Sequence, residues 1–216
     1  MKKILFFLFA ISSVMAQPAL VFDFDGVMTR EPDKEQIYSY LRDSLHLSRS
    51  EFEEIYPIIL SGQSGKEFWL ALADRKKVQI IPGWGDRFKT LMKNSFVNSE
   101  MFDLVDRLKN QNVTVVLFSN MNKNQAMRFQ EMGLFTSFEK RIFAYEIQTS
   151  KPDPKAYQML LRRLGLSASD IVFIDDHPEN VEMAKKMGID AILFQSAHQI
   201  HQELENRSIL HESDCD

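Results

Sequence analysis

The chain has 216 residues, of which 44% are apolar and 26% are charged, the usage of an ordinary globular protein that can bury a sizeable core. Its formal charge of -4 leaves no basic surface for a polyanion, so no nucleic acid is expected as a partner. The single cysteine, Cys215, excludes an intramolecular disulfide and a metal site built from cysteines.

Residues 1–16 have the pattern of a secretory signal peptide. Lys2 and Lys3 precede the apolar run 4–15, and Ala16 ends a stretch of small or permissive residues that a signal peptidase accepts. The run is shorter than the roughly 20 residues that span a bilayer, so we expect cleavage and no stable membrane span. The mature protein would be exported, either periplasmic or secreted. The alternative is a cytoplasmic protein that starts at Met15.

Two carboxylates follow the first predicted strand. The apolar run 19–22 predicts a buried strand, and Asp23 and Asp25 come at its end. Both face one site, because alternate residues of an extended chain project to the same side. Such close charges repel unless one is protonated or a cation lies between them. Gly26 allows a sharp turn. An acidic surface turn is one alternative; a calcium loop is disfavoured because it needs a Glu where this chain has Pro32.

A long helical stretch comes next. Helical spacing of apolar residues predicts helices at 32–45, 50–60, 66–74 and 84–93. Ser50 and Glu53 are predicted to form the capping box of the second of these helices. Trp69 and Trp84 are expected to pack inside this unit. We interpret residues 29–98 as a helical cap domain that covers the site at the end of the first strand.

From residue 99 onward, helices and strands alternate. The predicted helices are 100–110, 123–132, 153–164 and 178–187, and the predicted strands are 113–118, 142–145, 171–174 and 191–194. This alternation is typical of an α/β fold with a doubly wound parallel sheet. We therefore expect one core domain formed by residues 17–28 and 99–216.

Polar residues follow three of the predicted strands. Asp23 and Asp25 follow the first, Ser119 and Asn120 follow the strand 113–118, and Asp175 and Asp176 follow the strand 171–174. Ligands bind at the carboxyl ends of strands in open parallel sheets. Lys151, in a loop before a helix, can reach the same edge. Each residue alone has an ordinary explanation as a turn, a surface lysine or a helix start. Their convergence at one edge indicates a functional site.

The chain resembles the haloacid dehalogenase superfamily of aspartate-nucleophile phosphohydrolases, in the branch with a helical cap after the first strand (C1, subfamily IA). The resemblance covers about residues 20–194. Four segments carry it, in matching order and strand context: 23–27 (Asp-Phe-Asp-Gly-Val), 117–120 (Leu-Phe-Ser-Asn), 151–154 (Lys-Pro-Asp-Pro) and 174–180 (Ile-Asp-Asp-His-Pro-Glu-Asn). It implies a Rossmann-like core and a Mg²⁺-dependent phosphatase that hydrolyses a small phosphomonoester, such as a sugar phosphate, through an aspartyl-phosphate intermediate.

The resemblance also implies the catalytic roles. Asp23 would be the nucleophile, and Asp25 would be the general acid and base, a role that requires a raised pKa. Mg²⁺ would lie between the carboxylates of Asp23 and Asp176 and the backbone carbonyl of Asp25, an all-oxygen ligand set of the kind that Mg²⁺ prefers. Asp175 and Asn180 would orient the acidic loop, with Asp175 a possible additional ligand.

Phosphate and substrate binding are implied for further residues. Ser119 and the backbone near Asn120 would bind phosphate oxygens, and Lys151 would bind both the phosphate and Asp23. The loop 62–66 resembles the cap loop that faces the active site in related enzymes; its alternative is a plain interhelical turn. Three of its residues are candidates for substrate specificity: Gln63, Ser64 and Lys66.

Departures from the commonest pattern leave alternatives open. The last motif, Asp-Asp-x-x-x-Asn instead of Gly-Asp-x-x-x-Asp, resembles sugar-phosphate phosphatases and the phosphatase domain of soluble epoxide hydrolases. Dehalogenases lack the second aspartate of the first motif, so Asp25 disfavours dehalogenation. A phosphomutase and a catalytically silent phosphate-binding protein on the same fold remain alternatives. A receiver domain is disfavoured, because Asp175 and Asp176 come late in the chain. His177 is expected to line a helix start rather than to bind metal.

Overall fold

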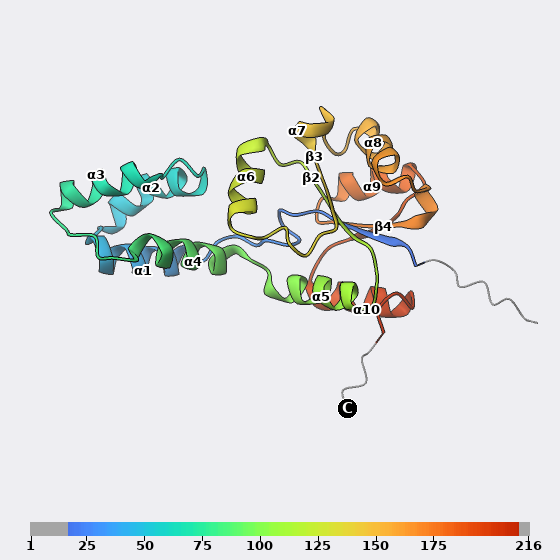
Figure 1. The fold of residues 1–216 in the computed structure, drawn as a ribbon, viewed down its shortest axis with the longest axis horizontal. Helices are drawn as coiled ribbons and strands as arrows, with labels where there is room; N and C mark the ends of the chain where they lie inside the picture. The colour runs from blue at the N-terminus through green and yellow to red at the C-terminus, as the bar shows by residue number, and fades with distance from the viewer. Residues whose placement is uncertain (1–16, 212–216) are drawn as a thin grey trace, which may run out of the picture.

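A computed structural model describes residues 17–211 (Figure 1). The predicted signal peptide and Cys215 lie outside the described residues. In the described part of the chain, no helix combines the length and the apolar character needed to cross a lipid bilayer.

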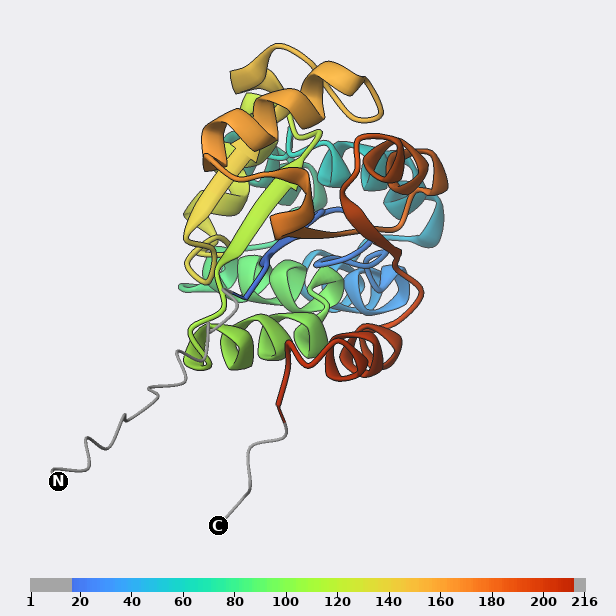
Figure 2. The same ribbon diagram turned by 90° about the vertical axis from the view of Figure 1, so that its right-hand side faces the viewer.

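A parallel sheet forms the centre of the core. Its strands are β1 (Ala19–Phe22), β2 (Val115–Ser119), β3 (Lys140–Phe143), β4 (Ile171–Asp175) and β5 (Asp190–Leu193). The order across the sheet is β3-β2-β1-β4-β5, which Figure 2 shows in colours from yellow through green, blue and orange to red. In the register, Phe22 of β1 pairs with Leu117 of β2 and Ile174 of β4. The predicted α/β fold with a doubly wound parallel sheet is confirmed.

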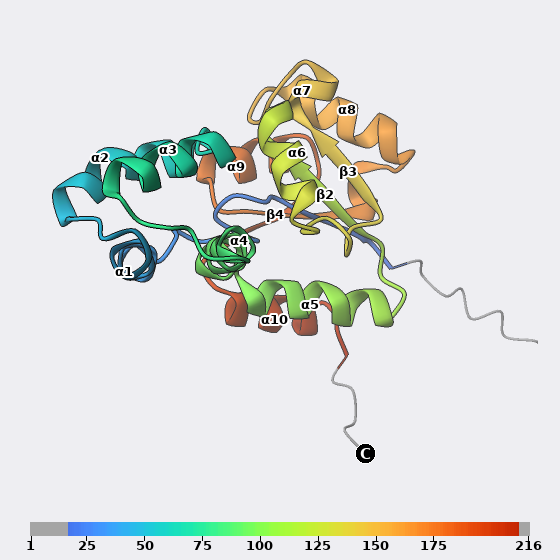
Figure 3. The same cartoon turned by 60° about the vertical axis from the view of Figure 1, so that its left-hand side comes forward.

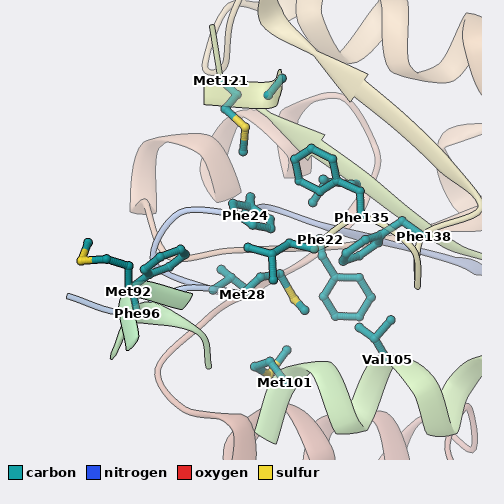
Figure 4. Packing of buried hydrophobic residues seen from close by; sticks show 14 of the residues in the cluster. Phe22, Phe24, Met28, Met92, Phe96, Met101, Val105, Met121, Phe135 and Phe138 are labelled. Carbon is teal, nitrogen blue, oxygen red and sulfur yellow. The ribbon is translucent and has the colours of Figure 1, made fainter. Parts of the chain in front are cut away.

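Helices cover both faces of this sheet. The helices α5 (Ser99–Asn110) and α10 (Ala197–Asn206) lie side by side on one face, and α8 (Pro154–Leu164) and α9 (Pro178–Lys186) lie on the other (Figures 1 and 2). Leu20 and Phe22 pack on the α5 side, whereas Val21 packs on the α8 side. A strand that is buried on both faces has a continuous apolar sequence. For this reason the central strands of the sheet could be predicted from the sequence. Figure 4 shows part of the α5 side, with Phe22, Met101, Val105 and Phe138 labelled.

Three shorter elements complete the core. They are α6 (Lys123–Glu131), α7 (Ala144–Ile147) and a 3-10 turn at Ala168–Asp170. The helix α6 follows β2 and lies on the side of the core that faces the inserted helices (Figures 1 and 3).

Four of the five helices between β1 and β2 form an inserted unit, while the fifth, α5, belongs to the core. The four inserted helices are α1 (Lys34–Leu45), α2 (Arg49–Leu60), α3 (Lys66–Lys76) and α4 (Trp84–Phe96). Strand β1 runs toward this unit, so the carboxyl edge of the sheet faces it (Figures 1 and 3). The rings of Trp69 and Trp84 are buried with centroids 5.2 Å apart, and Phe88 stacks on Trp84, so both tryptophans pack as expected. The two joining segments run side by side, with Thr29 paired to Val97 in an antiparallel bridge.

The predicted capping box of α2 was wrong by two residues. Ser48, not Ser50, is the N-cap; its Oγ accepts a hydrogen bond from the backbone N–H of Glu51 at 3.3 Å, and the Glu51 carboxylate accepts one from the Ser48 N–H at 2.8 Å. The segment contains the Ser-x-x-Glu pattern twice, so the local pattern does not choose between them. The helix as observed buries Phe52, Ile55 and Ile59.

In the carboxyl-terminal half of the chain, one predicted strand has different bounds in the structure and one helix was not predicted. The predicted strand 142–145 is β3, which starts earlier, at Lys140, and gives way to α7 at Ala144. Lys140 and Arg141 are exposed because β3 is an edge strand, and their charge hid the start of the strand. The helix α10 was not predicted, because its buried stripe is narrow. Its buried residues are Ile200 and Leu204.

Candidate active site

The carboxyl ends of β1, β2 and β4 surround one cavity of about 220 Å³. Asp23 directly follows β1, Ser119 ends β2 and Asp175 ends β4. These three ends are adjacent because β1 lies between β2 and β4. The cavity is lined by Asp23, Asp25, Ser119, Asn120, Lys151, Pro152, His177, Glu179 and Asn180. The structure therefore brings together the polar residues that the sequence predicted at this edge.

Lys151 forms the electrostatic centre of this cavity. Its Nζ lies 2.7 Å from Asp23 Oδ1 and 2.6 Å from Asp175 Oδ2, and it donates a hydrogen bond to the carbonyl oxygen of Phe118 at 2.9 Å. The residue is only 3% exposed. Buried charges of this kind are tolerated only when they are paired and hydrogen-bonded. Lys151 thus compensates part of the negative charge that two aspartates bring into the interior.

Asp175 is fixed by several hydrogen bonds and is completely buried. Besides Lys151, it accepts hydrogen bonds from Asn180 Nδ2, at 2.9 and 3.0 Å to its two oxygens, and from the His177 N–H at 2.8 Å. The backbone of Asn180 is also fixed, because its backbone carbonyl oxygen accepts a hydrogen bond from the Tyr157 hydroxyl at 2.8 Å. Both oxygens of Asp175 are engaged, which favours an orienting role over metal ligation.

Asn120 uses its side chain to hold the loop that carries Lys151. Its Nδ2 donates to the Lys151 carbonyl at 2.9 Å, and its Oδ1 accepts from the Lys151 N–H at 2.8 Å. The amide group is therefore occupied, and the backbone at Asn120 is the part left for a ligand. Ser119, at the end of β2, is 2% exposed and lines the cavity.

Asp23 and Asp25 face the same cavity, with Phe24 buried in the core between them. Burial raises the pKa of Asp23 to about 6, although the nearby Lys151 ammonium opposes this rise. Partial burial also raises the pKa of Asp25 above its ordinary value, again against the attraction of Lys151. A carboxyl group whose pKa lies nearer neutrality than usual is suited to exchanging protons with a substrate.

A group of ligand atoms fits a divalent cation. Carboxylate oxygens of Asp23, Asp175 and Asp176 and a ring nitrogen of His177 lie within 4.8 Å of one another. Gly26, with φ of 84°, lies against Asp176, where an added Cβ would collide with the carboxylate. Only glycine combines this backbone conformation with so close an approach. The carboxylates of Asp23 and Asp176 are hard oxygen donors of the kind that Mg²⁺ prefers, whereas both oxygens of Asp175 are already engaged by other residues.

His177 and Glu179 line the cavity without having been predicted as site residues. The His177 ring nitrogen Nδ1 lies 2.9 Å from Asp176 Oδ1, and this hydrogen bond raises the pKa of His177. His177 is also the N-cap residue of α9, as the sequence suggested. Its position next to Asp176 was the signal that it would reach the site.

The three cap residues proposed for specificity do not line the cavity. Gln63 and Lys66 are exposed, and Ser64 is half-buried. Their loop, between α2 and α3, lies instead against the core helix α6, where Leu60 accepts a hydrogen bond from Arg128. The sequence predicted the loop between two helices, but not this contact.

The fold and the site together place the protein among α/β proteins with a Rossmann-like core. In this class, ligands bind at the carboxyl edge of the sheet, where this chain has a buried lysine and a group of carboxylates. The chain belongs to the family of haloacid dehalogenase-like hydrolases, whose model matches residues 18–188.

Comparison with individual proteins gives more distant likenesses. A "Phosphorylated carbohydrates phosphatase" of Thermotoga maritima is 22% identical over 182 residues, which cover 81% of this chain and 83% of that protein. "Bifunctional epoxide hydrolase 2" of Rattus norvegicus is 23% identical, and the match covers 88% of this chain but 39% of the rat protein. A solved structure of a HAD family enzyme from Bacteroides thetaiotaomicron, in complex with magnesium and inorganic phosphate, superposes with a TM-score of 0.51 at 19% identity, covering 83% of this chain and 94% of that one.

Proposed function

We propose that this protein is a Mg²⁺-dependent phosphatase that hydrolyses small phosphomonoesters, such as sugar phosphates, through an aspartyl-phosphate intermediate. The observation that carries the proposal is the buried Lys151 between Asp23 and Asp175, beside a cavity of about 220 Å³. The likeness to a phosphorylated-carbohydrate phosphatase and to an enzyme bound to magnesium and phosphate supports it.

In the first half of the proposed reaction, Asp23 attacks the phosphorus atom. A bond forms between a carboxylate oxygen and phosphorus, the bond from phosphorus to the leaving oxygen breaks, and Asp25 donates its proton to that oxygen. In the second half, water attacks the aspartyl-phosphate, Asp25 takes up the water proton, and the Asp23 carboxylate is released with inorganic phosphate. The raised pKa of Asp25 suits this alternation.

Lys151 and Ser119 would bind the phosphate oxygens together with the backbone at Asn120. The Lys151 ammonium is fixed by two carboxylates and a carbonyl, so its position is set before the substrate arrives. Preorganised charge of this kind stabilises the transition state more effectively than mobile water does.

Mg²⁺ would be held by the carboxylates of Asp23 and Asp176 and by the backbone carbonyl of Asp25. When bound, it would neutralise charge on the transferring phosphoryl group, so that an anionic carboxylate can approach an anionic substrate. Asp175 and Asn180 would orient the loop that carries Asp176, in keeping with their mutual hydrogen bonds.

Two further features of the protein are proposed from its sequence. Residues 1–16 would direct export to the periplasm or beyond, and N-terminal sequencing of the native protein would then begin at Gln17. A cytoplasmic protein starting at Met15 is the alternative. The domain division would be a core of residues 17–28 and 99–216 and a cap of 29–98, which the pairing of Thr29 with Val97 supports.

The test is release of inorganic phosphate from a panel of phosphomonoesters by the protein starting at Gln17, with and without Mg²⁺. Asp23→Asn is expected to reduce turnover to background, and Asp25→Asn to reduce it by about 10²–10⁴-fold. Asp103→Asn, an exposed aspartate on α5, is the matched control. Conversion of a substrate to an isomer without net phosphate release would instead identify a phosphomutase. Phosphate binding without turnover would identify a catalytically silent protein.

A further inference from the structure

The Lys151 ammonium lies over two aromatic rings in addition to its three oxygen contacts. Its Nζ is 5.2 Å from the ring centroid of Phe118 and 5.2 Å from that of Phe173. Both distances are within the roughly 6 Å over which a cation is attracted to the electron-rich face of an aromatic ring. Both phenylalanines are buried, and this attraction is stronger where water is excluded.

The strands of the sheet bring the two rings to one place. Phe118 precedes Ser119 at the end of β2, and Phe173 lies two residues before Asp175 on β4. Alternate residues of a strand project to the same side, so Phe173 and Asp175 share one face of the sheet. Both phenylalanines belong to the core cluster on the α8 side, and their ring centroids are 6.1 Å apart. Lys151 therefore meets the two rings and the two aspartates together.

Tyr157 of α8 fixes the orientation of the two rings. Its ring meets that of Phe118 at 83° and that of Phe173 at 87°, with centroids 5.8 and 5.9 Å away. Edge-to-face contacts of this kind are a preferred geometry of aromatic pairs. The Tyr157 hydroxyl donates to the carbonyl of Asn180 on α9, so Tyr157 is itself anchored. We call Phe118, Tyr157 and Phe173 the aromatic support of Lys151.

Buried phenylalanines in strands have an ordinary explanation as core packing, which leucine would also provide. Leucine has no electron-rich face, however, and a single ammonium has to serve two carboxylates at this site. A shift of Nζ toward Asp175 would weaken its contact with Asp23, and the reverse shift would weaken the other contact. Two ring faces oppose either shift, because the attraction falls as the ammonium leaves them.

We infer that Phe118 and Phe173 are positioning residues, whose ring faces hold the Lys151 ammonium between Asp23 and Asp175. The consequence for catalysis rests on the proposed phosphatase function. An ammonium fixed in this place is preorganised toward the charge that develops on the transferring phosphoryl group. The consequence for stability does not depend on that function, because the buried ammonium is attracted to the rings whether or not a substrate is bound.

The first measurement needs no activity. Phe173 is replaced site-specifically by phenylalanine that carries one, two or three fluorine atoms on its ring. Fluorine withdraws electrons from the ring face, so the attraction for a cation falls with each atom while the ring keeps nearly the same size. The unfolding constant in urea is expected to rise stepwise, by about tenfold over the series. The same series at Phe138, which packs on the α5 side of the sheet, is the control and shows no such rise.

Removal of the cation tests the pairing directly. In Lys151→Met the side chain remains long but loses its charge, so fluorine at Phe173 is expected to have no effect on the unfolding constant. A fluorine effect that persists in Lys151→Met would show that it arises from packing and would overturn the inference. If Lys151→Met does not fold, the comparison of the series at Phe173 with the series at Phe138 decides in its place.

The second measurement is the turnover of a phosphomonoester by the same variants. An ammonium that is held less firmly stabilises the transition state less. The value of kcat is therefore expected to fall with each fluorine at Phe173, by about tenfold over the series, while KM stays within about twofold. Phe173→Leu, which removes the ring face, is expected to lower kcat by a similar factor. Phe138→Leu is the matched control, because it removes a buried ring on the other side of the sheet and leaves kcat within about twofold.

Fluorine effects of equal size at Phe173 and Phe138, or none at Phe173, overturn the inference. In an active enzyme, a kcat that does not depend on the number of fluorine atoms at Phe173 also overturns it. If the wild type releases no phosphate from any ester, the proposed function fails on its own. The unfolding measurements then still decide whether the ring faces hold Lys151.

Discussion

Lys151 is the residue on which the site depends most, because it compensates two buried carboxylates at once. Replacing it with alanine leaves Asp23 and Asp175 in a cavity with no cation, and removing one partner of a buried ion pair costs about 3–5 kcal/mol. Lys151→Ala is therefore expected to lower the free energy of unfolding in urea by about this amount at pH 7.5. Lys155→Ala, an exposed lysine on the next helix, provides the control. Equal unfolding free energies for the two variants would show that the ion pairs of Lys151 with Asp23 and Asp175 contribute nothing to stability.

Asp23 should make the stability of the metal-free protein depend on pH. Its pKa is raised from 3.8 to about 6, so the folded protein holds a proton that the unfolded chain releases. The stabilisation is complete below pH 3.8 and is lost as the pH rises through about 6. A shift of this size corresponds to about 3 kcal/mol. In EDTA, Asp23→Asn is therefore expected to gain stability relative to the wild type between pH 4.5 and pH 7. A constant difference across this range, measured by urea unfolding, would contradict the assignment.

At this scale, the identity of the site residues was predictable but their hydrogen bonding was not. Asp23 follows β1, while Ser119 and Asp175 are the last residues of β2 and β4, and each comes at the end of an apolar run that the sequence shows. That both oxygens of Asp175 are occupied, and that the Asn120 amide holds the Lys151 backbone, depends on loop conformations that no local pattern encodes.

At the scale of single elements, the start of α2 gives a direct comparison of two serines. Ser48 caps the helix and Ser50 does not, although both have a glutamate three residues later. Ser48→Ala is expected to lower stability by about 1 kcal/mol, because an orphan N–H of the first turn loses its acceptor. Ser50→Ala is expected to change stability by no more than a few tenths of a kcal/mol. The reverse ranking in thermal unfolding would show that the predicted cap was right.

Elements with strong apolar patterns were predictable, whereas the start of the edge strand β3 and the whole of α10 were not. The strand β2 is buried throughout and appears in the sequence as the apolar run 115–118, followed by Ser119. The edge strand β3 starts with Lys140 and Arg141, and α10 exposes most of its surface, so composition gave no clear pattern for either. Each of these two elements buries only two residues, Ile142 and Phe143 in β3 and Ile200 and Leu204 in α10.

At the scale of the whole molecule, alternating helices and strands predicted the sheet, because each strand must bury both of its faces. The uninterrupted helical patterns before residue 99 predicted the insertion. How the inserted helices meet the core was not predictable, since it depends on single polar contacts between distant segments. Arg128 with Leu60 and Lys93 with Met132 are two of them. Neither pair has a sequence pattern, because each acceptor is a backbone carbonyl.

A cation at the proposed site would join the ends of β1 and β4, so its binding should stabilise the whole core rather than one loop. A ligand at 100 times its dissociation constant adds about 2.7 kcal/mol to the folded state. We therefore expect saturating Mg²⁺ to raise the midpoint of thermal unfolding, and EDTA to reverse the effect. Asp176→Asn is expected to abolish the shift, because Asp176 contributes a carboxylate to the group that includes Asp23. An equal shift in Asp176→Asn, with NaCl as the ionic-strength control, would mean that Mg²⁺ binds elsewhere.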